Sequence, residues 1–173
     1  ETISIDASLF SSKILTWPIS GDMALRLCYG NNAYFAMSVG GFFPGYRAPG
    51  GFPDLRRLAI CFGGDNPKIM LSSYFAITDN SVQLGAGVEF LFQKDFGSII
   101  GNIKLEGGGG FDALIQFRPR FYFECGLYFR LNLSRNDRRL FFLSLDARFS
   151  GPNVFHLYGS CTVDIAGIFS KEF

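Results

Sequence analysis

Six of the fifteen carboxylates fall on the mixed faces of predicted strands, where they could support acid–base chemistry. They are Glu89, Glu106, Asp112, Glu124, Asp146 and Asp164. Two carboxylates facing each other across neighbouring strands could reach the separation at which glycosidases work. Side chains of this kind more often solubilise the face of a sheet or pair with arginine, here Arg130 or Arg148. We therefore expect a charged face without catalysis.

Histidine and cysteine are the other residue types that could carry chemistry. His156 is the only histidine, and neither GxSxG nor HExxH is present, so the usual triads and metal sites lack their partners. The four cysteines are far apart and form no CxxC pair: Cys28, Cys61, Cys125 and Cys161. We expect His156 to face solvent, the cysteines to be free thiols in a reducing, cytoplasmic compartment, and no metal or cofactor.

The run Gly107–Gly110 has the composition of a phosphate-binding loop. A P-loop continues with Lys-Ser/Thr and a helix, whereas Phe111-Asp112-Ala113 follows here. Glycines inside a strand pattern are typical of a bulge or a sharp bend. We expect such an interruption of the sheet at this point.

The elements that position these residues are strands, and the stretch 121–133 (FYFECGLYFRLNL) shows the pattern most clearly. Its odd-numbered residues are apolar and its even-numbered residues are mixed, as in a strand with two unlike faces. This alternation predicts that the apolar face is core, so that Leu127→Asp would cost several kcal/mol of stability.

Similar alternation recurs from Thr2 to Phe10, in further segments along the chain, and from Val154 to Phe169. Turn signals separate the segments, and none of useful length carries a 3.6-residue apolar stripe. We predict a single all-β domain over residues 1–173, an antiparallel meander of about ten to twelve strands with almost no helix. Periodicity leaves three architectures open: an open curved sheet, a sandwich and a barrel.

One long irregular stretch, Phe42–Asp54, carries three prolines and three glycines. That composition excludes a central strand or a helix. The aromatic residues Phe43, Tyr46 and Phe52 predict a loop that packs down on the sheet as a cover.

Several stretches resemble a domain-of-unknown-function family (serial six-six-zero-three) found in very long β-rich bacterial and fungal proteins. The matching pieces are SGDMALRLCYG (20–30), SVGGFFPGYRAPGGFPDLRRLAI (38–60), YFAITDNSVQLGA (74–86), GFDALIQFRPRFYFE (110–124) and Ser150-Gly151-Pro152. Near Asn153–His156 the chain departs from the family pattern, where a Trp is expected. The resemblance implies no known activity. It does imply a segment, or a short relative, of a longer β assembly.

Three functions remain open at this stage. The first is a non-enzymatic structural module that pairs with itself, or with the rest of a longer β-rich chain, through edge strands around Ile3, Ile5, Val163 and Ile165. The second is a binding module that shelters an apolar ligand, such as a lipid chain, in a Phe-lined groove. The third and least favoured is a membrane β-barrel. A net charge of +1 gives no electrostatic case for a nucleic-acid partner.

Overall fold

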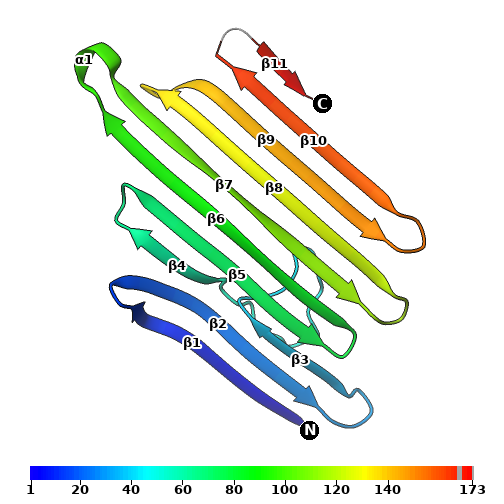
Figure 1. The fold of residues 1–173 in the computed structure, drawn as a ribbon. Coiled ribbons are helices and arrows are strands. Elements are labelled where there is room, and N and C mark those ends of the chain that lie inside the picture. Colours follow the sequence, from blue (N-terminus) through cyan, green and yellow to red (C-terminus); the bar gives the residue numbers. More distant parts are fainter. Residues whose placement is uncertain (167–168, 173) are drawn as a thin grey trace.

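The computed structural model describes residues 1–166 and 169–172, and it places eleven strands in one antiparallel sheet (Figure 1). The strands are β1 Thr2–Ile14, β2 Trp17–Cys28, β3 Tyr34–Val39, β4 Leu58–Gly63, β5 Lys68–Thr78, β6 Ser81–Asp95, β7 Asn102–Gln116, β8 Tyr122–Arg135, β9 Arg138–Gly151, β10 His156–Ile165 and β11 Phe169–Glu172. The one helix of the described part is α1, Gly97–Ile100. Of the three architectures left open by the sequence, this is the open sheet.

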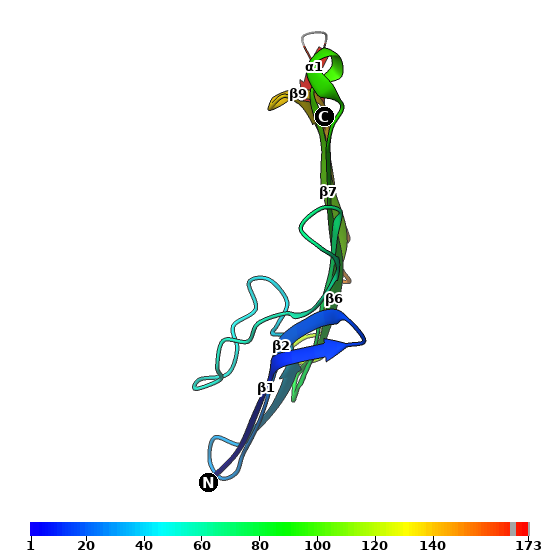
Figure 2. The same cartoon turned by 90° about the vertical axis from the view of Figure 1, so that its left-hand side faces the viewer.

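The strand order is almost the chain order, because nearly every connection is a hairpin. The path runs β1-β2-β3-β5 and on to β11, with β4 beside β2 and β5. Strands β3 and β4 therefore share one position end to end between β2 and β5, and β1 and β11 lie at opposite margins (Figure 1). Seen edge-on, the strands form one layer, and the loop between β3 and β4 stands off one side (Figure 2).

The tight turns follow the local chemistry of the chain. Between β8 and β9, Asn136 and Asp137 adopt φ of 48° and 61°, the left-handed backbone that a two-residue hairpin turn requires. The composition of Ser20-Gly21-Asp22 predicts a turn, and this prediction is wrong, because β2 runs straight through these residues. Gly21 is needed there because a Cβ at this position would lie 2.8 Å from the Leu58 Cα.

The predicted break at Gly107–Gly110 is also wrong. Strand β7 runs through all four glycines and pairs with β6 and β8 without a register shift. Neighbouring strands fill the space that side chains here would need. A Cβ on Gly107 would lie 2.8 Å from the Phe90 ring, and one on Gly110 would lie 2.9 Å from the Tyr128 ring.

The buried core is small and lies under the loop between β3 and β4, on the side of the sheet that carries the mixed residues of β8. Phe43 from the loop packs with Tyr74 and Leu114, and each of the three is less than a tenth exposed. The backbone N–H of Phe43 donates to Gln83 Oε1 at 2.8 Å, which satisfies a side chain that is fully buried. The expectation that the apolar face of β8 forms the core is wrong, because Leu127 is 59% exposed and the described part of the chain places no layer over it.

The loop cover is held by aromatic stacking and by arginine. Phe42 stacks on Tyr46 with 5.4 Å between ring centroids and meets Phe52 edge-on at 4.9 Å. Tyr46 and Phe52 are half-buried, unlike Phe43. Arg57 lies over the ring of Tyr74 and donates to the carbonyl oxygens of Gly40 and Phe42, both at 2.9 Å. The stretch behaves as a folded cover.

Candidate functional site

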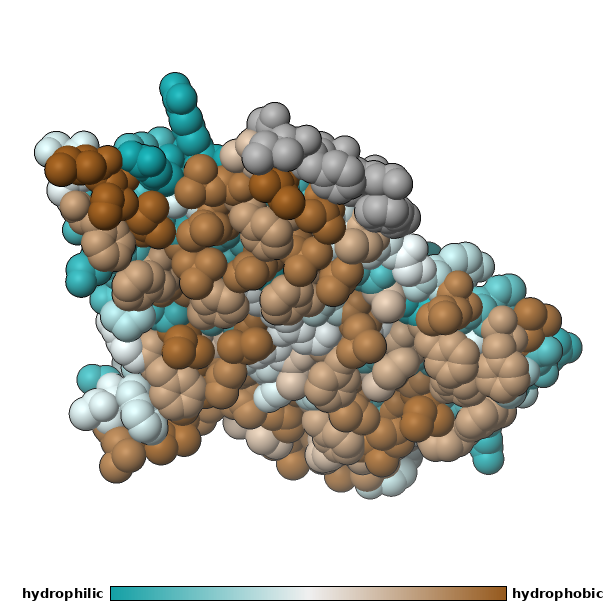
Figure 3. All heavy atoms as spheres, turned by 45° about the horizontal axis from the view of Figure 1, so that its top comes forward, coloured by the Kyte–Doolittle hydropathy of each residue, from teal (hydrophilic) through white to brown (hydrophobic). Residues whose placement is uncertain are grey.

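One side of the sheet is apolar across its central rows, and we call it the apolar face. The pairing registers place residues in rows that cross the strands. Three consecutive rows of seven residues each contain no charged side chain. They are Leu58-Ser73-Ala86-Phe111-Leu127-Ala147-Gly159, Ile60-Leu71-Val88-Gly109-Phe129-Leu145-Cys161 and Phe62-Ile69-Phe90-Gly107-Leu131-Leu143-Val163. Hydrophobic residues spread across this side of the molecule (Figure 3).

The apolar face is uneven, because small residues are interspersed with large ones. A hollow of about 610 Å³ lies where Ala147, Gly159 and Cys161 meet Leu127 and Phe129. A second hollow, of about 420 Å³, is lined by residues that include Ile60, Leu71, Ser73 and Ala86. Large side chains stand between the hollows, so the face presents both projections and recesses.

On the opposite side of the sheet, which we call the polar face, a tyrosine ring packs over glycines of the neighbouring strands. Gly87, Gly110 and Tyr128 occupy one row, and the ring of Tyr128 lies over Gly110 with its hydroxyl above Gly87. A Cβ on Gly87 would lie 2.8 Å from that hydroxyl oxygen. The glycines thus allow a large ring to lie flat across neighbouring strands.

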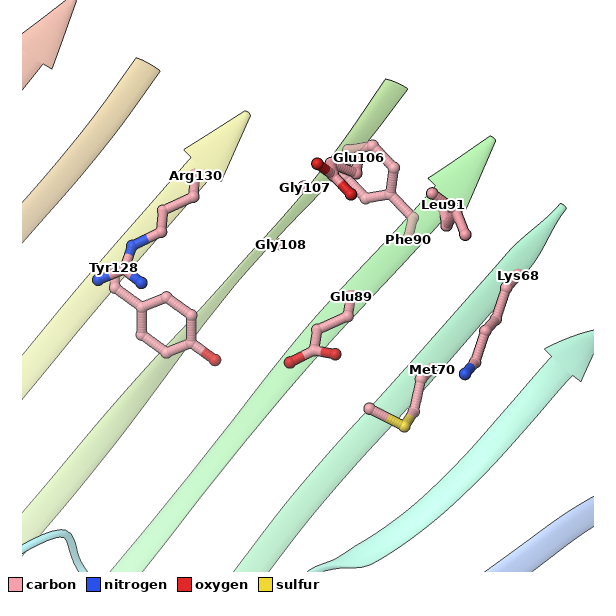
Figure 4. A pocket seen from close by; sticks show the side chains of 10 residues that line it. All are labelled: Lys68, Met70, Glu89, Phe90, Leu91, Glu106, Gly107, Gly108, Tyr128 and Arg130. Atoms are coloured by element: carbon pink, nitrogen blue, oxygen red, sulfur yellow. The ribbon is translucent and has the colours of Figure 1, made fainter. Parts of the chain in front are cut away.

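Beside Tyr128 a depression of about 390 Å³ has Gly108 as its floor (Figure 4). Glu89, Gly108 and Arg130 share a row, so the carboxylate and the guanidinium belong to strands two apart, with Cα atoms about 10 Å from each other. Tyr128 and Glu89 point toward each other over this floor (Figure 4). Glu89 and Arg130 are both exposed, as expected for a solvated face.

The other predicted carboxylates mostly serve structure. Glu124 pairs with Arg148 at 3.2 Å, as the sequence suggested, and Asp164 lies 3.7 Å from Arg139. Lys104 and the amide of Asn132 hold Glu106 and lower the pKa of its carboxyl. Asp146 accepts a hydrogen bond from Ser144, and Asp112 accepts one from Tyr74. Burial, with the added bond to Asp112, raises the pKa of Tyr74 far above its ordinary value.

Histidine and cysteine form no reactive cluster in the described part of the chain. His156 begins β10, is exposed, and stacks on Tyr158 with ring centroids 5.9 Å apart. No group of three or more His, Cys, Asp or Glu residues among the described positions could hold a metal ion. All four cysteines are free and half-buried. The registers place Cys125 and Cys161 on the apolar face, and Cys28 and Cys61 on the polar face.

The two predicted edges differ. Ile3 and Ile5 lie in β1, the outermost strand, and are 47% and 51% exposed. Val163 and Ile165 lie in β10, where they pair with β9 on one side and with Lys171 and Phe169 of β11 on the other. The predicted strand from Val154 to Phe169 is therefore a hairpin of two strands, whose positions 167–168 lie outside the described residues. Its second strand removes Val163 and Ile165 from the sheet margin.

Together these features define an all-β protein with a single open sheet, one apolar face, and a loop-covered polar face. The model of a family of unknown function, DUF6603, matches residues 1–173, and the chain belongs to that family. No curated protein and no solved structure matches the chain. No helix among the described residues is both long enough and apolar enough to cross a membrane.

Proposed function

We propose that the chain is a non-enzymatic structural module that joins a larger β assembly through the margin of its sheet at β1. The observation that carries this proposal is the open side of β1, which pairs with β2 alone among the described strands. Unpaired backbone groups on a long edge strand are a template for another strand.

The hydrogen-bond alternation identifies which residues of β1 would accept that strand. The Tyr29 N–H donates to the Glu1 carbonyl oxygen at 2.8 Å, so Glu1 and Tyr29 form a bonded pair. In an antiparallel ladder bonded and non-bonded pairs alternate, so Thr2, Ser4, Asp6 and Ser8 direct their N–H and C=O groups outward. Four consecutive outward positions are enough to dock a partner strand of ordinary length.

Little on β1 protects this margin against pairing. Proteins usually block an open edge with lysine, proline or an unpaired charge. The stretch from Thr2 to Ser12 has no proline, and its one charged residue, Asp6, is engaged by Arg26 at 2.6 Å. The bulge between Leu9 and Ser12 and the charge of Lys13 protect only the far end of β1. From Thr2 to Leu9 the margin is therefore open to a strand of a second copy, or of another part of a longer β-rich chain.

The test is Ser4→Pro, which removes one outward N–H and leaves the β1–β2 ladder complete. Ser4→Thr is the matched control, because it keeps the donor. Wild type and Ser4→Thr should sediment as species that grow with concentration, and Ser4→Pro should lose the largest of them while its circular dichroism stays that of the folded sheet. If Ser4→Pro sediments in the same way as wild type at every concentration, the proposal is contradicted.

A second candidate function is shelter of an apolar ligand, and the hollow of about 610 Å³ on the apolar face favours it. Leu127, Phe129 and Leu145 line this hollow. Addition of oleate should then slow the reaction of Cys125 and Cys161 with a thiol reagent, whereas Cys28 and Cys61 on the polar face serve as internal controls. Equal rates for all four thiols with and without oleate exclude this candidate.

A further inference from the structure

We infer that the apolar face is a docking surface for a second copy of this chain, which packs against it face to face to make a two-layer β sandwich. The inference goes beyond the proposed edge pairing of β1. It uses a different surface of the sheet, so either one can fail while the other stands.

The size of the apolar face argues for a second sheet as its occupant. Ten strand positions at about 4.8 Å, each with about ten residues at about 3.3 Å, give a face on the order of 1,500 Å². A standard stable interface buries about 800 Å² per partner, and obligate dimers bury more. A single acyl chain covers only one narrow row of such a face. A copy of the same sheet covers the whole of it.

The exposure of the side chains supports the same occupant. The following large apolar residues of this face are exposed: Ile3, Ile5, Ile69, Leu71, Phe75, Leu84, Val88, Phe92, Phe111, Ile115, Leu127, Phe129, Leu145, Phe149, Leu157 and Ile165. Their number approaches the 20 to 30 residues that each partner contributes to a standard interface. A contiguous apolar surface of this size is rare on a monomer that works alone.

The shape of the apolar face is suited to self-association. In a two-fold dimer the same patch meets itself, so it must carry both projections and recesses. The apolar face has both, because Leu127 and Phe111 project beside the hollows at Ala147–Gly159 and Ser73–Ala86. Two sheets packed in this way lie about 10 Å apart with interdigitating side chains.

The positions of the charged residues on this side of the sheet are compatible with a second copy that covers the centre of the apolar face. Alternation puts Lys94, Arg135 and Arg138 on this side of the sheet, all in one row at its end. That row lies at one end of the sheet, and Lys171, which the register sets opposite Val163, lies in β11 at its margin. A partner that covers the centre of the three rows therefore meets no charged residue. A lipid bilayer is a poorer occupant, because each unpaired backbone group at the β1 margin would cost several kcal/mol in hydrocarbon.

The experiment compares Leu127→Asp, at the centre of the apolar face, with Tyr158→Asp on the polar face. Both side chains are about three-fifths exposed, at 59% and 62%, so neither change disrupts the core of the single sheet. In sedimentation equilibrium, wild type and Tyr158→Asp should form dimers. Leu127→Asp should raise the dimer dissociation constant roughly tenfold or more, because it buries an unpaired charge in the interface. Leu145→Asp, in the adjacent row, is a second variant should Leu127→Asp fold poorly.

Thiol reactivity gives an independent readout of which face is covered. As wild-type concentration rises, the reaction of Cys125 and Cys161 should slow relative to that of Cys28 and Cys61. Ser4→Pro should leave this protection and the dimer intact, which separates face pairing from edge pairing. The inference is overturned by a wild type that remains monomeric at its highest soluble concentration, by equal weakening in both Asp variants, or by protection that appears only when oleate is added.

Discussion

The ring of Tyr74 lies across Gly85, its partner on the neighbouring strand, and its hydroxyl reaches Asp112 Oδ1 one strand further on, at 2.9 Å. Tyr74, Gly85, Asp112 and Gly126 occupy one row of the polar face. Because Gly85 has no side chain, a phenol from β5 can span β6 and bond to β7. The packing of the buried core therefore requires glycine at position 85.

Gly85→Ala should destabilise the sheet, because its new Cβ would clash with the Tyr74 ring and lie 2.7 Å from the Asp112 carboxylate. We expect a loss of about 1–3 kcal/mol in free energy of unfolding, the usual cost of overpacking. Gly126→Ala in the same row is the control, since a Cβ there meets nothing within 4 Å. It should be neutral or stabilising by up to about 1 kcal/mol. Urea denaturation of the two variants checks the contrast.

The raised pKa of Tyr74 predicts a loss of stability in alkali. Burial and the bond to Asp112 disfavour the phenolate, so the folded state holds the proton at a pH where the unfolded chain, with a pKa of about 10, releases it. The stabilisation is complete below pH about 10 and declines above it. The free energy of unfolding of wild type should therefore fall with pH above 10 more steeply than that of Tyr74→Phe. Parallel curves for the two proteins in alkaline urea titrations would contradict the burial of this hydroxyl.

Asp22 and Arg56 should make the loop anchor sensitive to acid. Arg56 donates from its guanidinium and backbone N–H to the Asp22 carboxylate, with distances of 2.7–2.9 Å, and these bonds lower the pKa of Asp22 from 3.8. A lowered folded pKa gives stabilisation that is present above pH about 4 and is lost as pH falls below it. The stability difference between wild type and Asp22→Asn should be constant from pH 7 to 5 and should shrink below pH 4. A difference that persists unchanged to pH 2 would show that the ion pair does not anchor the loop.

The alternation in the sequence correctly predicted strands, hairpins and the division of residues between two faces, because side-chain direction in a strand is a local property. It could not predict which face is buried, since that depends on where the loop of Phe43 and Tyr46 comes to rest. Phe43, set between glycines and prolines, covers the mixed face, whereas none of the described residues forms a layer over the apolar face.

The tyrosine–glycine rows were missed for a related reason. Gly85 and Gly110 look like interruptions when each segment is read alone. Their role in making room for a tyrosine ring is clear only from the register, which sets Gly85 opposite Tyr74 and Gly110 opposite Tyr128. Large residues that face glycine on an adjacent predicted strand are the signal that could have indicated them. The hairpin of β10 and β11 was missed because alternation continues across its turn.

The face that the sequence predicted to be core is exposed, and the mixed face is buried under the loop. A last prediction follows from this difference and contrasts two leucines on neighbouring strands. Leu114 in β7 is 7% exposed beneath the loop, whereas Leu127 in β8 is 59% exposed on the apolar face. At a concentration low enough to keep the protein monomeric, Leu114→Asp should cost about 3 kcal/mol or more, because it buries an unpaired charge. Leu127→Asp should change the free energy of unfolding by less than about 1 kcal/mol, since its carboxylate stays in water. Denaturation of both variants across a dilution series checks this, and the cost of Leu127→Asp should grow with concentration as the second copy binds. A large cost for Leu127→Asp at every dilution would instead mean that the apolar face is already covered within one chain.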